Sequence, residues 1–252
     1  MNQKTEKLLA VLGGDKIPDS QTFRDLVTTI DSHQALAKVF ILEGTPYVFE
    51  KSPMKYVIFR EQVAERFGVG SQDVCIVGSA KLGFSPSAHK YGRKFEEASD
   101  VDVVVISDEL FDRGSQELFA HINSLKPGSH EVRNFQHGGG TEPKVPLESW
   151  SAAKDAVRNF TFQNFNPGLL PHNNPLRVDI FNKISSTAGL FLALEPKVFV
   201  SKIRCRIFRT WKAAESYYAN SLRELGEALS GQQVEISEDE DMEAENVQQG
   251  AA

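Results

Sequence analysis

Two aspartates separated by one residue, Asp100 and Asp102, begin an otherwise apolar run that ends at Ile106. The run is rich in β-branched residues, which predicts a strand over 101–106. Residues two apart on a strand point to the same face, so both carboxylates would lie at one site. Two like charges are costly to desolvate together, and divalent cations would turn that cost into a binding site. The alternative is that Asp100 caps a turn and Asp102 faces solvent.

A third acid, Asp179, is central to the apolar segment Leu-Arg-Val-Asp-Ile-Phe, which we predict to be a third strand over 176–181. An acid on an apolar strand needs water or a partner. If this strand lies beside the strand over 101–106, Asp179 completes a three-carboxylate cluster. Such a cluster suits two Mg²⁺ ions, which prefer oxygen ligands and share them with substrate phosphates. Taken alone, Asp179 would be a surface acid on an edge strand.

The pair Gly78-Ser79 follows a short apolar strand predicted over 73–77. A glycine lets the backbone approach a phosphate closely, and a helix that begins here would aim free N–H groups at the anion. The Ser79 hydroxyl adds a donor. Gly-Ser pairs are also common in ordinary turns, which is the alternative.

The remaining pattern predicts helices on both sides of these strands. We expect two short helices within residues 1–40 and longer ones over 54–67 and 108–124. One face of the first long helix is expected to carry its apolar residues: Val57, Ile58, Val63, Ala64 and Phe67. The Gly-, Pro- and His-rich segment 126–149 reads as a loop, and a short helix is expected around 151–158. An amphipathic pattern from 196 to about 229 predicts long C-terminal helices.

The order strand, Gly78-Ser79, Asp100-x-Asp102 and a later Asp179 resembles the nucleotidyltransferase superfamily of DNA polymerase β. Relatives of this kind include second-messenger synthases of bacterial anti-phage immunity and antitoxin-type nucleotidyltransferases. The resemblance covers about 74–181. The spacer between Ser79 and Asp100 is longer than the family's usual gap, so the subfamily is not determined. The acid pattern is unaffected, because a surface loop lengthens at little free-energy cost.

The resemblance implies an α+β fold: a polymerase β-like core, with a small mixed sheet flanked by helices, and a helical C-terminal part. We expect the catalytic core with its N-terminal helices over 1–186 and the C-terminal helical region over 187–230. The acidic composition of 231–252 predicts a disordered tail.

The resemblance also implies a mechanism. The triphosphate of an NTP or dNTP would lie over Gly78 and Ser79, while Asp100, Asp102 and Asp179 bind Mg²⁺ or Mn²⁺ and act as the catalytic acids. A hydroxyl acceptor would attack the α-phosphorus and pyrophosphate would leave, with the metals stabilising both oxygens.

Basic residues are candidates for phosphate contacts. Lys81 follows the Gly-Ser pair closely, and Lys202 is the preferred candidate from the C-terminal part. Lys202, Arg206 and Arg209 would share one helix face. The alternative is that this basic face is simply exposed to solvent. The inserted loop 84–97 supplies further bases: Lys90, Arg93 and Lys94. Three aromatic residues are candidates for stacking on a nucleotide base: Phe84, Tyr91 and Tyr218. The alternative is that they belong to the hydrophobic core.

The resemblance leaves three functions open. The leading one is a metal-dependent nucleotidyltransferase that makes a nucleotide signal in bacterial anti-phage defence. The second is nucleotidyl transfer onto a protein or tRNA, as in toxin-antitoxin systems. The third is a catalytically silent module that binds a nucleotide or a protein. Analogy of fold does not choose among them.

Composition narrows the setting. The chain has 252 residues, 40% hydrophobic and 25% charged, which is typical of soluble globular proteins. Its net charge of −6 comes from the tail, since 235–245 holds seven acids and no base. No apolar stretch suits a membrane span, and the polar residues 1–7 do not resemble a signal peptide. Because Cys75 and Cys205 are both expected in the core, we expect a cytoplasmic protein.

The near-neutral charge of residues outside the tail argues against extensive duplex nucleic acid as a partner. A partner protein encoded nearby is a further expectation.

Overall fold

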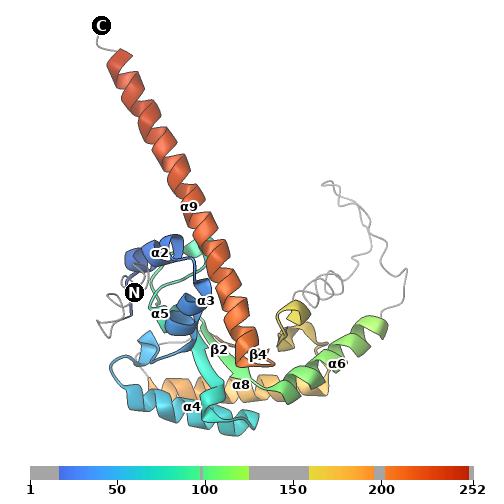
Figure 1. Ribbon diagram of the computed structural model, residues 1–252. Helices are drawn as coiled ribbons and strands as arrows, with labels where there is room; N and C mark the ends of the chain where they lie inside the picture. Colours follow the sequence, from blue (N-terminus) through green and yellow to red (C-terminus); the bar gives the residue numbers. More distant parts are fainter. Residues whose placement is uncertain (1–16, 97–98, 125–158, 196–201, 250–252) are drawn as a thin grey trace, which may run out of the picture.

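The computed structural model describes residues 17–96, 99–124, 159–195 and 202–249 (Figure 1). In these residues a four-stranded sheet has the order β1-β2-β4-β3. Strand β2 pairs antiparallel with β1 and parallel with β4, and β3 pairs antiparallel with β4, so the sheet is mixed. The strands are β1 (Val74–Val77), β2 (Val101–Ile106), β3 (Asn164–Phe165) and β4 (Ile203–Phe208). The predicted α+β class with a small mixed sheet is confirmed.

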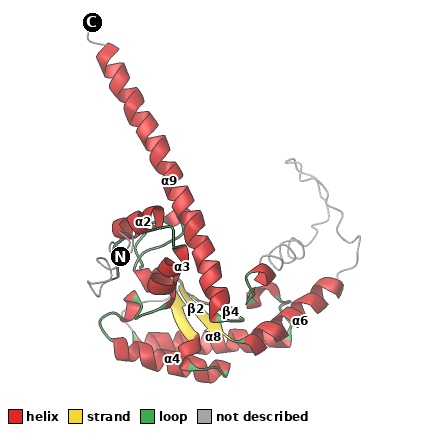
Figure 2. Cartoon of the chain, in the orientation of Figure 1, coloured by secondary structure: helices red, strands yellow, loops and turns green. Residues whose placement is uncertain are grey.

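Helices make up most of the rest of the described chain (Figure 2). The α-helices are α2 (Ser20–Thr29), α3 (His33–Leu36), α4 (Pro53–Phe67), α5 (Ser79–Leu82), α6 (Asp108–Ser124), α8 (Pro175–Leu194) and α9 (Trp211–Gln249). A π-helix, η1 (Ala37–Leu42), continues α3, and the 3-10 helices are η2 (Tyr47–Phe49), η3 (Ser71–Asp73), η4 (Ala88–Lys90) and η5 (Pro167–Leu169). None of the described helices is long and apolar enough to cross a membrane.

Two apolar layers cover the two faces of the sheet. One core cluster takes Val103 of β2 together with side chains of α4 and α8. The other takes Val104 of β2 together with side chains of α2, η1 and α9. Figure 1 shows the same arrangement, with α4 and α8 beneath the sheet and α2 and α3 above it. Because side chains alternate along a strand, every second residue of β2 and β4 belongs to the α9 face.

The elements with strong local sequence signals are present in the structure as predicted. The strands over 73–77 and 101–106 and the helix over 108–124 are confirmed as β1, β2 and α6. The helix over 54–67 is confirmed as α4, which begins with proline and ends at Gly68 in the left-handed region. Residues 126–149 and 151–158, predicted as a loop and a helix, lie outside the described residues.

The buried face of α4 agrees with the prediction only in part. Val63, Ala64 and Phe67 are buried as expected, but Val57 and Ile58 are 44% and 42% exposed. The residues flanking them, Tyr56 and Phe59, are buried instead. Aromatic rings remove more apolar area from water than valine or isoleucine, which favours this rotation of the helix.

The predicted third strand over 176–181 is wrong, because this segment is the start of α8. The Asn174 side chain caps the helix by accepting hydrogen bonds from the backbone N–H groups of Leu176 and Arg177. Pro175 occupies the first turn, where its missing N–H costs nothing. The buried residues recur at helical spacing: Leu176, Ile180, Ile184, Thr187 and Phe191.

The C-terminal part differs from the helices that the sequence predicted. Residues 203–208, predicted as helix, form β4 in the centre of the sheet. Helix α9 continues to Gln249, through most of the tail for which disorder was predicted. That segment contains no proline and is rich in good helix formers such as Glu, Gln and Ala.

Candidate functional site

The turn after β1 brings the glycine of the Gly-Ser pair against an aspartate. Gly78 has φ 70° and ψ −145°, a conformation that essentially only glycine adopts. A Cβ atom at this position would lie 2.9 Å from Oδ2 of Asp102. The two residues meet because Val77 is in register with Asp102 across the β1–β2 pair. Gly78 therefore allows the Asp102 carboxylate to pack against the end of β1.

Asp102 lies on the α9 face of β2, and Asp100 precedes the strand by one residue. Burial raises the pKa of Asp102, and the negative charge of Asp100 adds to the rise, whereas Arg204 and Arg206 oppose it. The two acids are therefore close enough to influence each other, as their spacing predicted. Asp102 is the residue whose desolvated charge most needs a cation or a proton.

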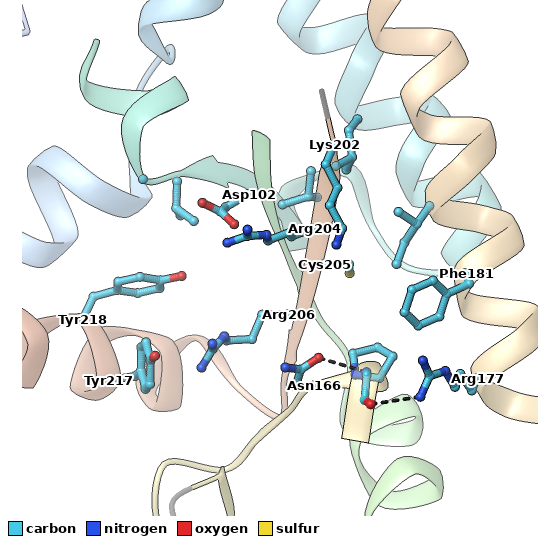
Figure 3. A pocket seen from close by; sticks show the side chains of 17 residues that line it. Asp102, Asn166, Arg177, Phe181, Lys202, Arg204, Cys205, Arg206, Tyr217 and Tyr218 are labelled. Carbon is cyan, nitrogen blue, oxygen red and sulfur yellow. Dashed lines mark hydrogen bonds between the residues drawn. The ribbon is translucent and has the colours of Figure 1, made fainter. Parts of the chain in front are cut away.

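That cation is supplied by the neighbouring strand. Arg204 of β4 is in register with Asp102, and its Nη2 lies 2.5 Å from Oδ2 of Asp100. Figure 3 shows the guanidinium of Arg204 beside the carboxylate of Asp102. The strand that pairs with β2 thus carries an arginine where the predicted cluster required a third acid.

A second arginine two residues along β4 is held in a fixed position. The Arg206 guanidinium lies 4.7 Å from the ring centroid of Tyr217, close enough for a cation–π contact. Its Nη1 donates a hydrogen bond of 3.4 Å to Oδ1 of Asn164. Asn164 is buried, and its Nδ2 has no hydrogen-bond partner among the residues that the structure describes. Tyr217 and Asn164 therefore orient the Arg206 side chain before any ligand arrives.

These side chains border a pocket of about 600 Å³ at the ends of β1, β2 and β4 and beside α8 and α9. Figure 3 shows Asp102, Arg204 and Arg206 on the side of β4 that faces Tyr217 and Tyr218. The charged residues that line the pocket are one acid and four bases: Asp102, Arg177, Lys202, Arg204 and Arg206. Its aromatic lining residues are Phe181, Tyr217 and Tyr218. Such a lining favours an anion with an attached ring.

Asp179 is not brought to this pocket. It lies on α8 with its side chain 51% exposed, and its Oδ2 pairs with Nζ of Lys183, one helical turn away, at 2.9 Å. The predicted three-carboxylate cluster is therefore not formed. Within the described residues, no group of three or more His, Cys, Asp or Glu side chains could hold a metal ion. A two-Mg²⁺ centre does not fit the donors present, because one of the two remaining acids is already paired with Arg204.

Lys81 is also placed elsewhere than predicted. Its side chain is buried, and Nζ donates hydrogen bonds to the backbone carbonyls of Glu43 and Gly44. Desolvation lowers its pKa from the usual 10.5 to about 8. Lys81 fastens the end of η1 to α5 and does not line the pocket beside Asp102. Helix α5 is only one turn long, so it has little of the helix dipole that would attract a phosphate to its N-terminus at Ser79.

Of the other predicted bases, Lys202 lines the pocket, although it precedes a strand and does not lie on a helix. The inserted loop folds away from the pocket. A bridge between Phe84 and Lys94 closes it, and the Tyr91 hydroxyl donates to the carbonyl of Ser20. Phe84 and Tyr91 therefore belong to the core, the alternative that their spacing had left open.

The sequence did not identify several residues that line the pocket and are used in the site: Asn166, Arg177, Phe181, Arg204 and Tyr217. The strand signal for Arg204 was present, since Ile203, Cys205 and Ile207 alternate with polar residues. No sequence signal marked Asn166 or Arg177, which reach the pocket only through the packing of η5 and α8.

Comparison of the chain with protein-family models, with curated proteins and with solved structures yields no significant match.

Proposed function

We propose that this chain binds a phosphorylated nucleotide in the pocket beside β4. The observation that carries the proposal is the lining, which comprises four bases, one acid and three aromatic residues, with Arg204 and Arg206 on the same side of β4 as Asp102 (Figure 3). Guanidinium groups match the geometry of phosphate oxygens and form charge-assisted hydrogen bonds with them. A pocket of about 600 Å³ is within the range of small-molecule sites.

The aromatic residues give the pocket a place for a base. Tyr217 and Tyr218 are adjacent on α9, with their ring centroids 5.2 Å apart and their planes at 86°. Phe181, on α8, is 38% exposed and lies on the other side of β4 from the two tyrosines (Figure 3). Aromatic side chains in a pocket wall favour planar rings, so a nucleotide fits this lining better than inorganic phosphate does.

The resemblance to the nucleotidyltransferase superfamily would imply the same ligand class. The strand before Gly78-Ser79 and the antiparallel strand with Asp102 are present in the implied order, but the later strand, β4, carries Arg204 and no acid. The meeting of Asp102 with Gly78 also favours a second candidate function, nucleotidyl transfer from NTP or dNTP to a hydroxyl acceptor. The missing third carboxylate places this candidate behind simple binding.

Calorimetry with each NTP and dNTP, and with inorganic tripolyphosphate, tests the proposal. We expect a nucleotide to bind more tightly than tripolyphosphate, because only the nucleotide contacts the aromatic wall. Arg206→Ala should weaken binding about 10-fold or more, the worth of one charged hydrogen bond. Arg223→Ala is the matched control, since Arg223 is paired with Glu227 on α9 and does not line the pocket.

The same protein incubated with nucleotides and Mg²⁺ or Mn²⁺ separates the two candidates. A product that is absent from the Asp100→Ala/Asp102→Ala double variant would establish nucleotidyl transfer. Binding without any product supports a binding module. If no nucleotide binds, both candidates are refuted.

A further inference from the structure

The sheet face that borders the pocket carries balanced charges. Asp102 and Arg204 lie on the face opposite Val103 and Ile203, and the alternation of strands places Asp100 and Arg206 on that face too. The formal charges of these two acids and two arginines cancel. A face with a third acid in place of Arg204 would instead carry a net negative charge.

The position of Arg204 determines which cation can lie beside the carboxylates of Asp100 and Asp102. It is in register with Asp102 and pairs with Asp100, so it touches the carboxylate that a divalent ion would need. A divalent ion placed between the acids would also meet the positive charges of Arg204 and Arg206 at short range. Like charges at such distances repel strongly wherever water is partly excluded.

We propose that Arg204 substitutes for a metal ion, so that the pocket binds the phosphates of its ligand in the metal-free form. This inference rests on the proposed nucleotide binding and adds which ionic form is recognised. A guanidinium has five N–H donors in a planar fork. Arg204 can therefore keep its contact with Asp100 and still offer donors to a phosphate.

Arg206 completes the phosphate site. Tyr217 and Asn164 fix its guanidinium, whereas the Arg204 side chain is 59% exposed and is oriented by Asp100. Two oriented guanidiniums two residues apart on one strand suit a ligand with adjacent phosphates. The ligand class is thus a nucleoside di- or triphosphate without bound Mg²⁺.

Calorimetric titration of the full chain with ATP, GTP, CTP, UTP and inorganic tripolyphosphate, in EDTA and in excess Mg²⁺, tests the proposal. We expect the affinity for the tightest ligand in EDTA to equal or exceed its affinity in Mg²⁺, because Mg²⁺ neutralises the charge that the arginines recognise. An affinity that rises about 10-fold or more on addition of Mg²⁺ overturns the proposal.

The variant Arg204→Asp creates the acidic face that a metal site requires. In EDTA it should bind the same ligand about 100-fold more weakly than the wild-type chain, since an attraction is lost and a repulsion is gained. Addition of Mg²⁺ should restore part of that loss. Because Arg204 is largely exposed, the substitution removes little packing, and circular dichroism and a melting curve check that the variant folds.

The matched control is Arg223→Asp, which reverses the charge of another exposed, ion-paired arginine outside the pocket. It should bind as the wild type does in both buffers. If Arg204→Asp also binds as the wild type does, Arg204 does not contact the ligand and the proposal is overturned.

The outcomes separate this inference from the proposed function. Binding that occurs only with Mg²⁺ leaves nucleotide binding standing and overturns the role of Arg204. Absence of binding by every nucleotide and by tripolyphosphate, in both buffers, refutes both. Binding in EDTA that depends on Arg204 supports both.

Discussion

Replacement of Lys81 by methionine should change how the stability of the protein depends on pH. The Lys81 side chain is 3% exposed and donates to the carbonyls of Glu43 and Gly44. Desolvation lowers its pKa from 10.5 to about 8 in the folded protein, whereas the unfolded chain keeps the usual value. Each pKa unit corresponds to ~1.4 kcal/mol, so the buried charge costs the folded state about 3 kcal/mol at neutral pH.

The direction of the pH effect follows from proton binding. Above about pH 8 the folded protein releases the Lys81 proton, while the unfolded chain still holds it. The unfolded state then binds more protons, so stability rises with pH. Between about pH 7 and pH 9 the wild type should gain about 1–2 kcal/mol relative to Lys81→Met. Buried tyrosines such as Tyr91, whose pKa desolvation raises to about 12, titrate alike in both proteins and cancel in the difference.

Urea unfolding at several pH values measures this difference in the free energy of unfolding. Lys212→Met, which removes an exposed lysine of α9, shows what the loss of a surface charge does to the same curve. The affinity for tripolyphosphate should be unchanged by Lys81→Met. A stability difference that stays flat or shrinks as pH rises would refute the reasoning. A stability difference that does not change with pH, together with a large loss of tripolyphosphate affinity, would indicate that Lys81 contacts phosphate, as its position in the sequence suggested.

Three further substitutions test the site residue by residue. Gly78→Ala should lower the free energy of unfolding by about 1–3 kcal/mol, because a left-handed, extended conformation and the contact with Asp102 both exclude a Cβ; chemical denaturation measures it. Asp179→Asn should leave nucleotide affinity unchanged and alter stability by less than about 0.5 kcal/mol, because it breaks only a half-exposed helical ion pair; calorimetry and a melting curve check both. Arg206→Lys should weaken nucleotide binding roughly 10-fold despite keeping the charge, because an ammonium neither stacks on Tyr217 nor offers a fork of donors; titration of the two proteins side by side tests it.

The elements that the sequence predicted correctly carry their information locally. The β-branched run of β2 and the proline and glycine at the ends of α4 specify strand and helix within a few residues. The strands and helices themselves need no knowledge of distant partners. The meeting of Asp102 with Gly78 depends in addition on the register of β1 with β2, which neither strand specifies alone.

The strand predicted around Asp179 is wrong because a segment of six residues carries too little information. Six residues with one central acid satisfy a strand pattern as well as a helical one. The longer stretch from Leu176 to Phe191 buries residues every three or four positions, and Asn174-Pro175 is a helix start. Both signals were in the sequence, and they outweigh the local β-propensity.

The case of β4 is different because its identity depends on a partner far away in the chain. Lys202, Arg206 and Arg209 have the spacing of a helix face, and the alternation of Ile203 and Ile207 has the period of a strand. Parallel pairing with β2 decides between them, and it needs a crossover through α6 and α8. Periodicity within the segment does not contain that information.

The chemistry of the site therefore depends on a choice that the acid motif alone does not determine. Asp100 and Asp102 would have the same local geometry beside an acidic neighbour strand or beside a basic one. In the first case the face would carry excess negative charge and would require cations from solution. Here Arg204 brings the cation within the fold, in register with Asp102 and 2.5 Å from Asp100, and the acids serve to orient it. In our proposal, the residue opposite Asp102 thus determines whether the same Gly-Ser and Asp-x-Asp pattern would bind metal ions or would present arginines to a phosphate.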